Sequence, residues 1–138
     1  HEVGVGLHGR RVREAGDPSG SVCVIAIGKM LEVATKAADQ LAERGADVTV
    51  WDARCCAPLD PEMLADAARH RRVITVEDGV RDGGIGMTAA AEIATIDTSV
   101  PVEVLGLPTT FLPHDPKPGN IHARYGLDAE SLAERALG

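Results

Sequence analysis

Two adjacent acidic residues, Glu77 and Asp78, directly follow a short apolar run in this sequence of 138 residues. The run, Val73 to Val76, has the composition of a buried strand. A carboxylate pair at a strand end can act as general acid and base or contribute oxygen ligands to a metal ion. No nucleophile and no further oxygen ligand accompanies the pair in the sequence. We therefore expect it to order a loop or to form an interface.

A glycine-rich segment comes next, and Gly84 to Ala89 matches the dinucleotide fingerprint G-x-G-x-x-A. In that fingerprint the first glycine follows the strand directly. Here seven residues intervene, and the acidic residue expected at the end of the next strand is misplaced. The alternative is that these glycines let a loop and a helix start pack closely against another protein surface. The residues expected at a domain or dimer interface are Glu77, Asp78, Gly83, Gly84 and Gly86.

The histidines offer a second kind of chemistry. His114 and His122 lie in a long segment that also contains Asp115, and a His–Asp couple is part of hydrolase triads. No G-x-S-x-G nucleophile motif accompanies them. We expect the histidines, His70 among them, to be surface or hinge residues. His114 is the one candidate to face an active site formed mostly by other parts of a larger molecule, and no catalytic, cofactor-binding or metal-binding residue is expected on this chain.

Cysteine usage indicates a reducing compartment. Cys23, Cys55 and Cys56 lack the spacing of a disulfide framework or a zinc site. Cys23 lies inside an apolar run, which predicts a small core residue. This pattern suits the cytoplasm, where disulfides are rare.

Composition excludes several classes of partner. The net charge of −7 argues against nucleic acid, whose phosphates require a basic surface. No apolar run reaches the roughly 20 residues of a membrane span. The hydrophobic fraction of 44% is ample for one folded domain. The sequence begins with His1 instead of Met, from which we expect a fragment of a longer protein.

The elements that would position these residues alternate regularly. Strands are expected at 22–27, 47–51, 73–76 and 102–105, and helices at 29–44, 60–70, 84–96 and from 128 onward. Arg10 to Glu14 is expected to form a short charged edge strand. Alternation of strands and helices predicts a parallel sheet covered by helices on both faces, a three-layer α/β/α domain.

Local signals fix several helix ends. Asp60 and Asp128 are predicted N-caps. Each is preceded by a leucine at the hydrophobic-staple position, and the two predicted staple pairs are Leu59 with Leu64 and Leu127 with Leu132. For the helix at 84–96, helical spacing predicts an inner face made of Ile85, Ala89, Ile93 and Ile96.

Three stretches together resemble the C-terminal domain of the 1-deoxy-D-xylulose-5-phosphate synthase family, which is transketolase-like. Asp47 to Asp60 resembles the family's strand, D-x-R turn and P-L-D helix start. Ile74 to Gly86 is similar to its T-V-E element followed by G-G-x-G. The third stretch follows the family's ending in order, with Gly106-Leu107-Pro108, Phe111, His114 and Gly126-Leu127-Asp128-Ala129-Glu130. The resemblance covers roughly residues 5 to 137.

The resemblance implies a mostly parallel sheet of about five strands with one antiparallel edge strand. It also implies a parent enzyme, a cytoplasmic homodimer, that uses thiamine diphosphate and Mg²⁺ to join pyruvate to glyceraldehyde 3-phosphate for isoprenoid precursors. The cofactor-binding motifs of the family belong to its upstream domains, and none maps onto this chain. The isolated chain is therefore expected to be inactive and to contact the upstream domains of the same polypeptide.

Two domain segments are expected: an irregular segment 1–20 that continues from an upstream domain, and the α/β domain proper at 21–138. Two alternatives stay open at this point. The chain could be the C-terminal domain of a transketolase or of a 2-oxoacid dehydrogenase E1 β component. It could also be a stand-alone module that binds a nucleotide or anion at the helix start near Gly84.

Overall fold

The computed structural model describes residues 9–54, 59–80, 84–107 and 127–137. Five strands form one sheet in the order β1-β3-β2-β4-β5. They are β1 (Arg10–Arg13), β2 (Val22–Ile27), β3 (Val48–Asp52), β4 (Arg72–Val80) and β5 (Val102–Leu107). All neighbouring strands pair in parallel except β1 and β3, which are antiparallel. The expected mixed sheet with one antiparallel edge strand is confirmed.

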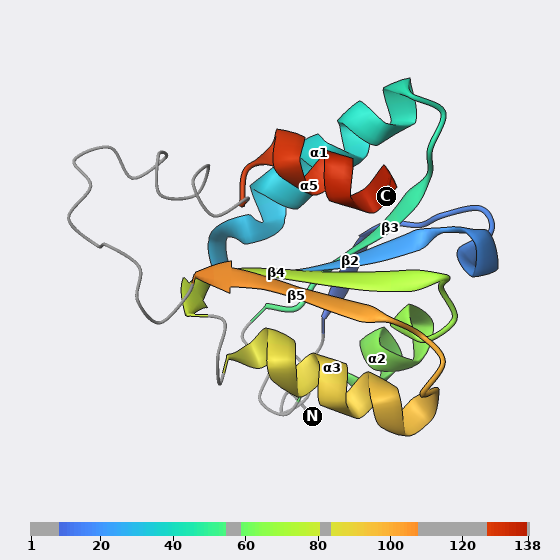
Figure 1. Ribbon diagram of the computed structural model, residues 1–138, viewed down its shortest axis with the longest axis vertical. Helices are drawn as coiled ribbons and strands as arrows, with labels where there is room; N and C mark the ends of the chain where they lie inside the picture. Colours follow the sequence, from blue (N-terminus) through green and yellow to red (C-terminus); the bar gives the residue numbers. More distant parts are fainter. Residues whose placement is uncertain (1–8, 55–58, 81–83, 108–126, 138) are drawn as a thin grey trace, which may run out of the picture.

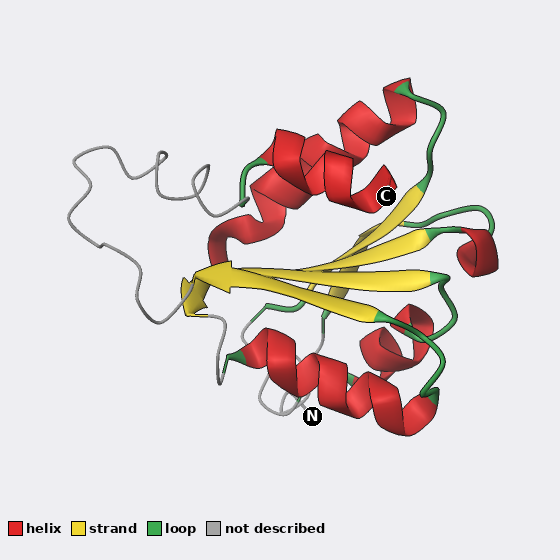
Figure 2. Ribbon diagram, in the orientation of Figure 1, coloured by secondary structure: helices red, strands yellow, loops and turns green. Residues whose placement is uncertain are grey.

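Helices cover both faces of the sheet, as Figures 1 and 2 show. One face is covered by α1 (Leu31–Glu43) and α5 (Ala129–Leu137), the other by α2 (Pro61–Ala67) and α3 (Ile85–Ile96). A 3₁₀ turn at Gly28–Met30 leads into α1. The three-layer α/β/α prediction is therefore confirmed.

The central strand β2 supplies both halves of the core. Its six residues are all buried, and alternate side chains point to opposite faces. Val22, Val24 and Ala26 pack in the cluster under α1 and α5. Cys23, Ile25 and Ile27 pack in the cluster above α2 and α3. A continuous apolar run is what a parallel strand between two helical layers requires.

The edge strand β1 joins the first segment of the chain to this sheet. Arg10 pairs with Asp52 and Arg11 with Trp51 of β3. The charged edge strand expected from Arg10 to Glu14 is confirmed. The expected link between residues 1–20 and an upstream domain stays a prediction.

Both predicted N-caps are confirmed. The Asp60 carboxylate accepts a hydrogen bond of 2.9 Å from Glu62 N, and Pro61 is the first residue of α2. Asp128 Oδ1 accepts one of 2.9 Å from Ser131 N, just before α5. The staple leucines are buried in pairs within one core cluster each.

Two expectations about helix α3 and strand β4 are wrong. Ile96 is 52% exposed and does not belong to the inner face of α3, because it is the last helical residue and no described element covers it. Strand β4 continues to Val80, so Glu77 and Asp78 lie inside the strand and not after its end.

Candidate functional site

The Glu77 side chain of β4 points inward and meets the start of α3. It is 6% exposed, and its Oε1 accepts a hydrogen bond of 3.1 Å from the backbone N–H of Gly86. The first N–H groups of a helix have no partner within the helix. Gly84, the N-cap of α3, supplies no side-chain cap. The carboxylate of Glu77 therefore caps α3 from the neighbouring strand, and its negative charge suits the helix N-terminus.

Gly86 makes this contact possible because it has no side chain. A Cβ at this position would lie 2.6 Å from Thr75 Oγ1 and 3.0 Å from both Glu77 Oε1 and Val104 Cγ1. The glycine thus lets the first turn of α3 rest directly on β4 and β5. The close approach that the sequence predicted at this glycine is made to the chain's own sheet.

This arrangement bears on the anion-binding alternative. A free anion at the N-terminus of α3 would bind the exposed N–H groups of its first turn. The Glu77 carboxylate already bonds to one of them, and a second negative charge beside it would be repelled. Thr75 Oγ1, which is fully buried and has no hydrogen-bond partner among the described residues, is covered by Gly86. The geometry therefore argues against a phosphate site at this helix.

The other sequence-predicted residues are only partly placed. Gly84 lies at the start of α3 and is half-buried. Asp78 lies in β4, whereas Gly83 and His114 fall outside the described residues, as do Cys55 and Cys56. The interface role of the segment 77–86 stays a prediction.

A second polar cluster, which the sequence reasoning missed, surrounds Asp66 of α2. Its Oδ2 accepts a hydrogen bond of 2.8 Å from Trp51 Nε1, and its Oδ1 accepts one of 2.9 Å from Arg69. The Arg11 guanidinium lies 3.4 Å from Asp66 Oδ2 and 5.8 Å from the centre of the Trp51 ring. These contacts join the edge strand β1 to α2 across β3.

His70 belongs to the same cluster and corrects an expectation. It was predicted to be a surface or hinge residue, yet it is 3% exposed. Its Nδ1 lies 2.8 Å from the backbone oxygen of Asp66, and its Nε2 lies 2.7 Å from Thr49 Oγ1. Thr49 Oγ1 also accepts a hydrogen bond of 3.0 Å from Ala15 N. The i to i+4 spacing of Asp66 and His70 is the one feature of the sequence that could have indicated their contact. The contact with Thr49 depends on tertiary packing.

Two hollows lie away from the Glu77 region. One of about 350 Å³ is lined by residues of the Asp66 cluster, including Arg11, Trp51 and Arg69. The arginines there share Asp66, and Glu62 also lines the hollow, so positive and negative groups balance. Their balanced charge gives no preference for an anion.

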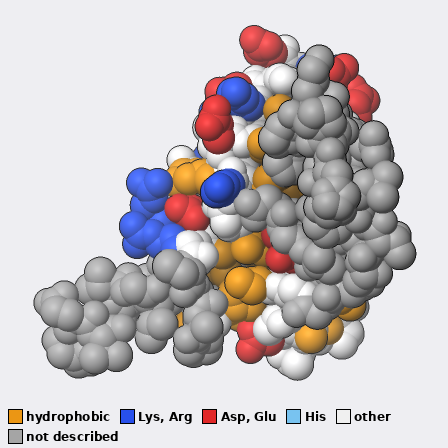
Figure 3. All heavy atoms as spheres, turned by 90° about the vertical axis from the view of Figure 1, so that its left-hand side faces the viewer, with side chains coloured by type: hydrophobic (Ala, Val, Ile, Leu, Met, Phe, Trp, Pro, Cys, Tyr) orange, Lys and Arg blue, Asp and Glu red, His pale blue; other side chains and the backbone are white. Residues whose placement is uncertain are grey.

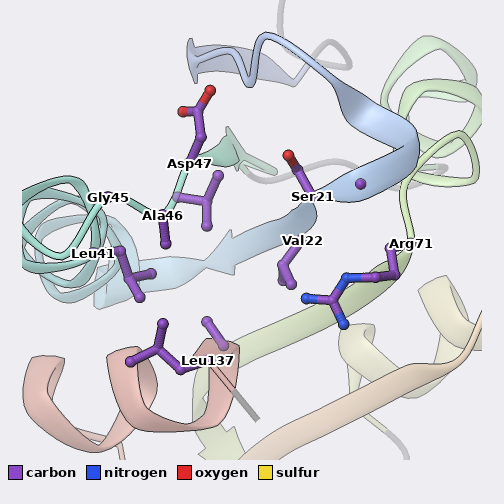
Figure 4. A pocket seen from close by; sticks show the side chains of 11 residues that line it. Ser21, Val22, Leu41, Gly45, Ala46, Asp47, Arg71 and Leu137 are labelled. Atoms are coloured by element: carbon purple, nitrogen blue, oxygen red, sulfur yellow. The ribbon is translucent and has the colours of Figure 1, made fainter.

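The other hollow, of about 310 Å³, lies at the amino ends of β2 and β3 (Figure 4). Leu41, Val22 and Leu137 contribute apolar walls. Asp47 and Arg71 stand on opposite sides of it. The Asp47 carboxylate accepts a hydrogen bond of 2.8 Å from Gly16 N, which ties it to a neighbouring loop. Among the described residues that line this hollow, no group of convergent polar atoms indicates a reaction site.

The donor set for a metal-bound cofactor is not met by the described residues. Within ranges 9–54, 59–80, 84–107 and 127–137, no three His, Cys, Asp or Glu side chains gather as a metal site. Glu77 is engaged by Gly86, and Asp66 by Trp51 and Arg69. Burial raises the pKa of the Cys23 thiol, the nearby Asp66 charge adds to this rise, and the residue is inert core. These residues do not fit a diphosphate held through Mg²⁺.

In the part of the chain that the structure describes, no helix combines the length and apolar character needed to cross a bilayer.

Known sequences give matches that agree with this picture. A family model described as "Transketolase, C-terminal domain" matches residues 10–132. The 1-deoxy-D-xylulose-5-phosphate synthase of Thermobifida fusca (strain YX) is 38% identical over 121 residues. The 1-deoxy-D-xylulose-5-phosphate synthase 2 of Kitasatospora griseola is 36% identical over 122 residues. Each match covers 88% of this chain but only 19% of the relative, so the chain spans about a fifth of their length.

Solved structures share the fold. A structure described as a split gene transketolase, inactive beta4 tetramer, superposes with a TM-score of 0.80 at 29% identity. That match covers 96% of this chain and 43% of the other. The transketolase of Campylobacter jejuni subsp. jejuni NCTC 11168 gives a TM-score of 0.64 at 17% identity, over 96% of this chain and 19% of the other, and supports the fold alone. With the family model matched over residues 10–132, the chain belongs to the transketolase C-terminal domain family.

Proposed function

We propose that this chain is the C-terminal, non-catalytic domain of a 1-deoxy-D-xylulose-5-phosphate synthase-like transferase. The observation that carries the proposal is the identity of 38% with the Thermobifida fusca synthase across 88% of this chain. The matched part is about a fifth of the relative, which leaves most of that enzyme for cofactor and substrate binding.

The parent enzyme is proposed to join pyruvate to glyceraldehyde 3-phosphate with loss of CO₂, in the cytoplasm and as a homodimer. Transfer of a two-carbon unit requires a stabilised carbanion, which thiamine diphosphate supplies and protein side chains do not. The described residues of this chain offer no donor set for that cofactor. Its binding is therefore assigned to the parent's upstream domains, and no chemical step is assigned to this chain.

The proposed contribution of this chain to the parent is therefore structural. Glu77 and Gly86 hold the first turn of α3 against the sheet from inside. We propose that the surrounding segment, which includes Asp78, Gly83 and Gly84, meets the upstream domains or the second subunit. This edge of the sheet is the carboxyl end of the parallel strands, where open α/β sheets place their working surface.

A domain replacement tests the proposal. The region of the Thermobifida fusca synthase that matches this chain is exchanged for residues 9–138, and formation of 1-deoxy-D-xylulose 5-phosphate is measured. We expect the chimaera to retain activity within an order of magnitude of the parent, whereas deletion of the region abolishes it. A chimaera that folds and binds thiamine diphosphate but forms no product contradicts the proposal.

A second candidate, the C-terminal domain of a transketolase, is favoured by the superposition with the split gene transketolase. The same domain exchange, made in an active transketolase, distinguishes the synthase proposal from the transketolase proposal. The synthase reading predicts better complementation of the synthase than of the transketolase. The opposite order would favour ketol transfer between sugar phosphates.

A further inference from the structure

Helix α3 differs from the other long helices in the face that it turns outward. Only one of its 12 residues, Glu92, is charged. The exposed residues of α3, which we call the α3 outer face, are Met87, Thr88, Ala91, Glu92, Ala94, Thr95 and Ile96, so Glu92 is the single charge on this face. A helix that is apolar or uncharged on all sides is normally covered on all sides.

Helices α1 and α5 provide the contrast within the same molecule. The exposed charged residues on them are Glu32, Lys36, Asp39, Glu43, Glu130, Glu134 and Arg135. Some of these form ion pairs, such as Lys36 with Glu32 at 3.2 Å and Arg44 with Glu134 at 2.9 Å. In Figure 3 acidic side chains gather at the top of the viewed side and basic ones at the left, whereas hydrophobic ones show mainly near the centre and in the lower part, where an acidic side chain also shows. The outer faces of α1 and α5 therefore have the charged residues typical of a solvent-exposed surface, whereas the α3 outer face has few.

The apolar surface continues from α3 to the neighbouring edge of the sheet. Strand β5 is the last strand of the described sheet on that side, and its Val102 and Val104 are only half-buried. Its acidic residue, Glu103, is paired with Arg135 of α5. The opposite edge, β1, carries arginines at three of its four positions. Charge on an edge strand blocks pairing with other chains, and of the two described edge strands β1 carries three charged residues whereas β5 carries one.

The chain itself indicates what lies beside this surface. The Gly9 N–H donates a 2.8 Å hydrogen bond to Asp60 Oδ2, at the start of α2. Helices α2 and α3 cover the same face of the sheet (Figure 1). Gly9, the first residue that the structure describes, therefore lies beside α2 on the face of the sheet that α2 and α3 cover. The curated relatives carry about four fifths of their length outside the matched region.

We propose that the α3 outer face, together with the exposed side of Val102 and Val104 on β5, is the docking surface for the preceding domains of the parent polypeptide. This inference rests on the proposed function, because it requires a parent with such domains. It predicts a partner surface that is apolar and poor in charge, as in the core of stable interfaces. The outer faces of α1 and α5 remain in water.

Single-cysteine labelling in the intact parent tests the inference without use of activity. Ala91→Cys reports on the α3 outer face, and Ala42→Cys, at an exposed alanine of α1, is the matched control. Cys55, Cys56 and the cysteines of the parent's other domains are replaced by serine, while buried Cys23 is kept. Maleimide labelling rates are measured in the native and in the urea-denatured parent. Thr88→Cys is a second probe of the same face should the first variant misfold.

We expect Cys at 91 or 88 to react at least an order of magnitude more slowly in the native parent than in the denatured one, and Cys at 42 to react at similar rates in both. Fast native labelling at 91 and 88 overturns the proposal. Protection that disappears when the parent is diluted to a monomer assigns the face to a second copy and also overturns it. Synthase activity is measured on the same preparation, so fast labelling in an active enzyme contradicts the docking surface alone, whereas protection in an inactive parent contradicts only the proposed function.

Discussion

The Glu77 carboxylate of β4 accepts a hydrogen bond of 3.1 Å from the Gly86 N–H in the first turn of α3. One residue is an acid on a strand, the other a glycine on a helix, and nine positions separate them. Their contact fixes the start of α3 relative to the sheet. Glu77, an acidic residue of a type that could act in catalysis, is therefore a buried helix cap.

Gly86→Ala should destabilise the domain even though alanine favours helices. The added Cβ would lie 2.6 Å from Thr75 Oγ1, far inside normal contact distance. Overpacking of this kind costs about 1–3 kcal/mol. Chemical denaturation of the variant gives the free energy of unfolding. Thr75→Ala in the same background removes the nearest atom and should recover part of the loss, and an absence of recovery would contradict the assigned clash.

Glu77→Ala should lower the free energy of unfolding by about 1–3 kcal/mol, because Gly86 N–H is buried and loses its acceptor. Glu77→Gln keeps an oxygen acceptor and should cost less. Both values come from urea melts of the two variants. Equal losses for Gln and Ala would show that the acceptor oxygen is not what holds α3.

The two N-caps should differ in strength. Asp60 is 2% exposed and accepts hydrogen bonds from both Glu62 N and Gly9 N, whereas Asp128 bonds at the surface to Ser131. Loss of a cap costs roughly 0.5–2 kcal/mol. We expect Asp60→Ala at the upper end of this range and Asp128→Ala near its middle. A larger loss for the Asp128 variant in urea melts would contradict the structural ranking.

The stabilisation by Asp128 should also depend on pH. Hydrogen bonding by the Ser131 side chain, and then by its backbone, lowers the pKa of Asp128 below its ordinary value. A carboxyl with a lowered folded-state pKa stabilises fully above its unfolded pKa, near about 4, and loses the effect as pH falls through the folded value. The difference between the natural chain and Asp128→Ala should therefore be constant from neutral pH to about 4 and shrink below. A difference that persists unchanged well below this pH contradicts the assignment.

Asp66→Ala should cost far more than Arg69→Ala. The Asp66 side chain is 9% exposed and bonds to Trp51 Nε1, whereas the Arg69 side chain is 59% exposed. Loss of Asp66 leaves the buried Trp51 Nε1–H without its acceptor, which costs about 1–3 kcal/mol. Loss of the exposed arginine should cost less than about 1 kcal/mol. Thermal unfolding of the two variants decides the order.

The strands and helix caps could be predicted from local patterns. The run from Val22 to Ile27 is apolar at every position, which only a strand buried on both faces explains. Asp60 followed by Pro61 marked the start of α2 to the residue. Gly45, with φ of 79°, sits just past the end of α1 where a left-handed residue is needed.

The burial of the Glu77 side chain could not be predicted in the same way, although the sequence contains a pattern that is consistent with it. Val73, Thr75 and Glu77 share one face of β4, and this alternation is visible only if the strand continues past Val76. The apolar run instead predicts a strand that ends at Val76 and a loop that begins after it. The helix that accepts it is placed by tertiary packing, which the local pattern does not contain.

The Asp66 cluster was missed for a different reason. Its members come from α2, β3 and the edge strand, so their proximity depends on the strand order. The sequence predicts a surface or hinge position for His70 because no motif surrounds it. Hydrogen bonds to Asp66 O and Thr49 Oγ1 allow it to be buried.

The central claim is that this chain carries fold and contacts but no cofactor site, and titration calorimetry tests it most directly. The folded chain, verified by a cooperative urea melt, is titrated with thiamine diphosphate in the presence of Mg²⁺. The account predicts no saturable heat at millimolar cofactor. A saturable binding heat with one-to-one stoichiometry would contradict it and place a cofactor site on this chain.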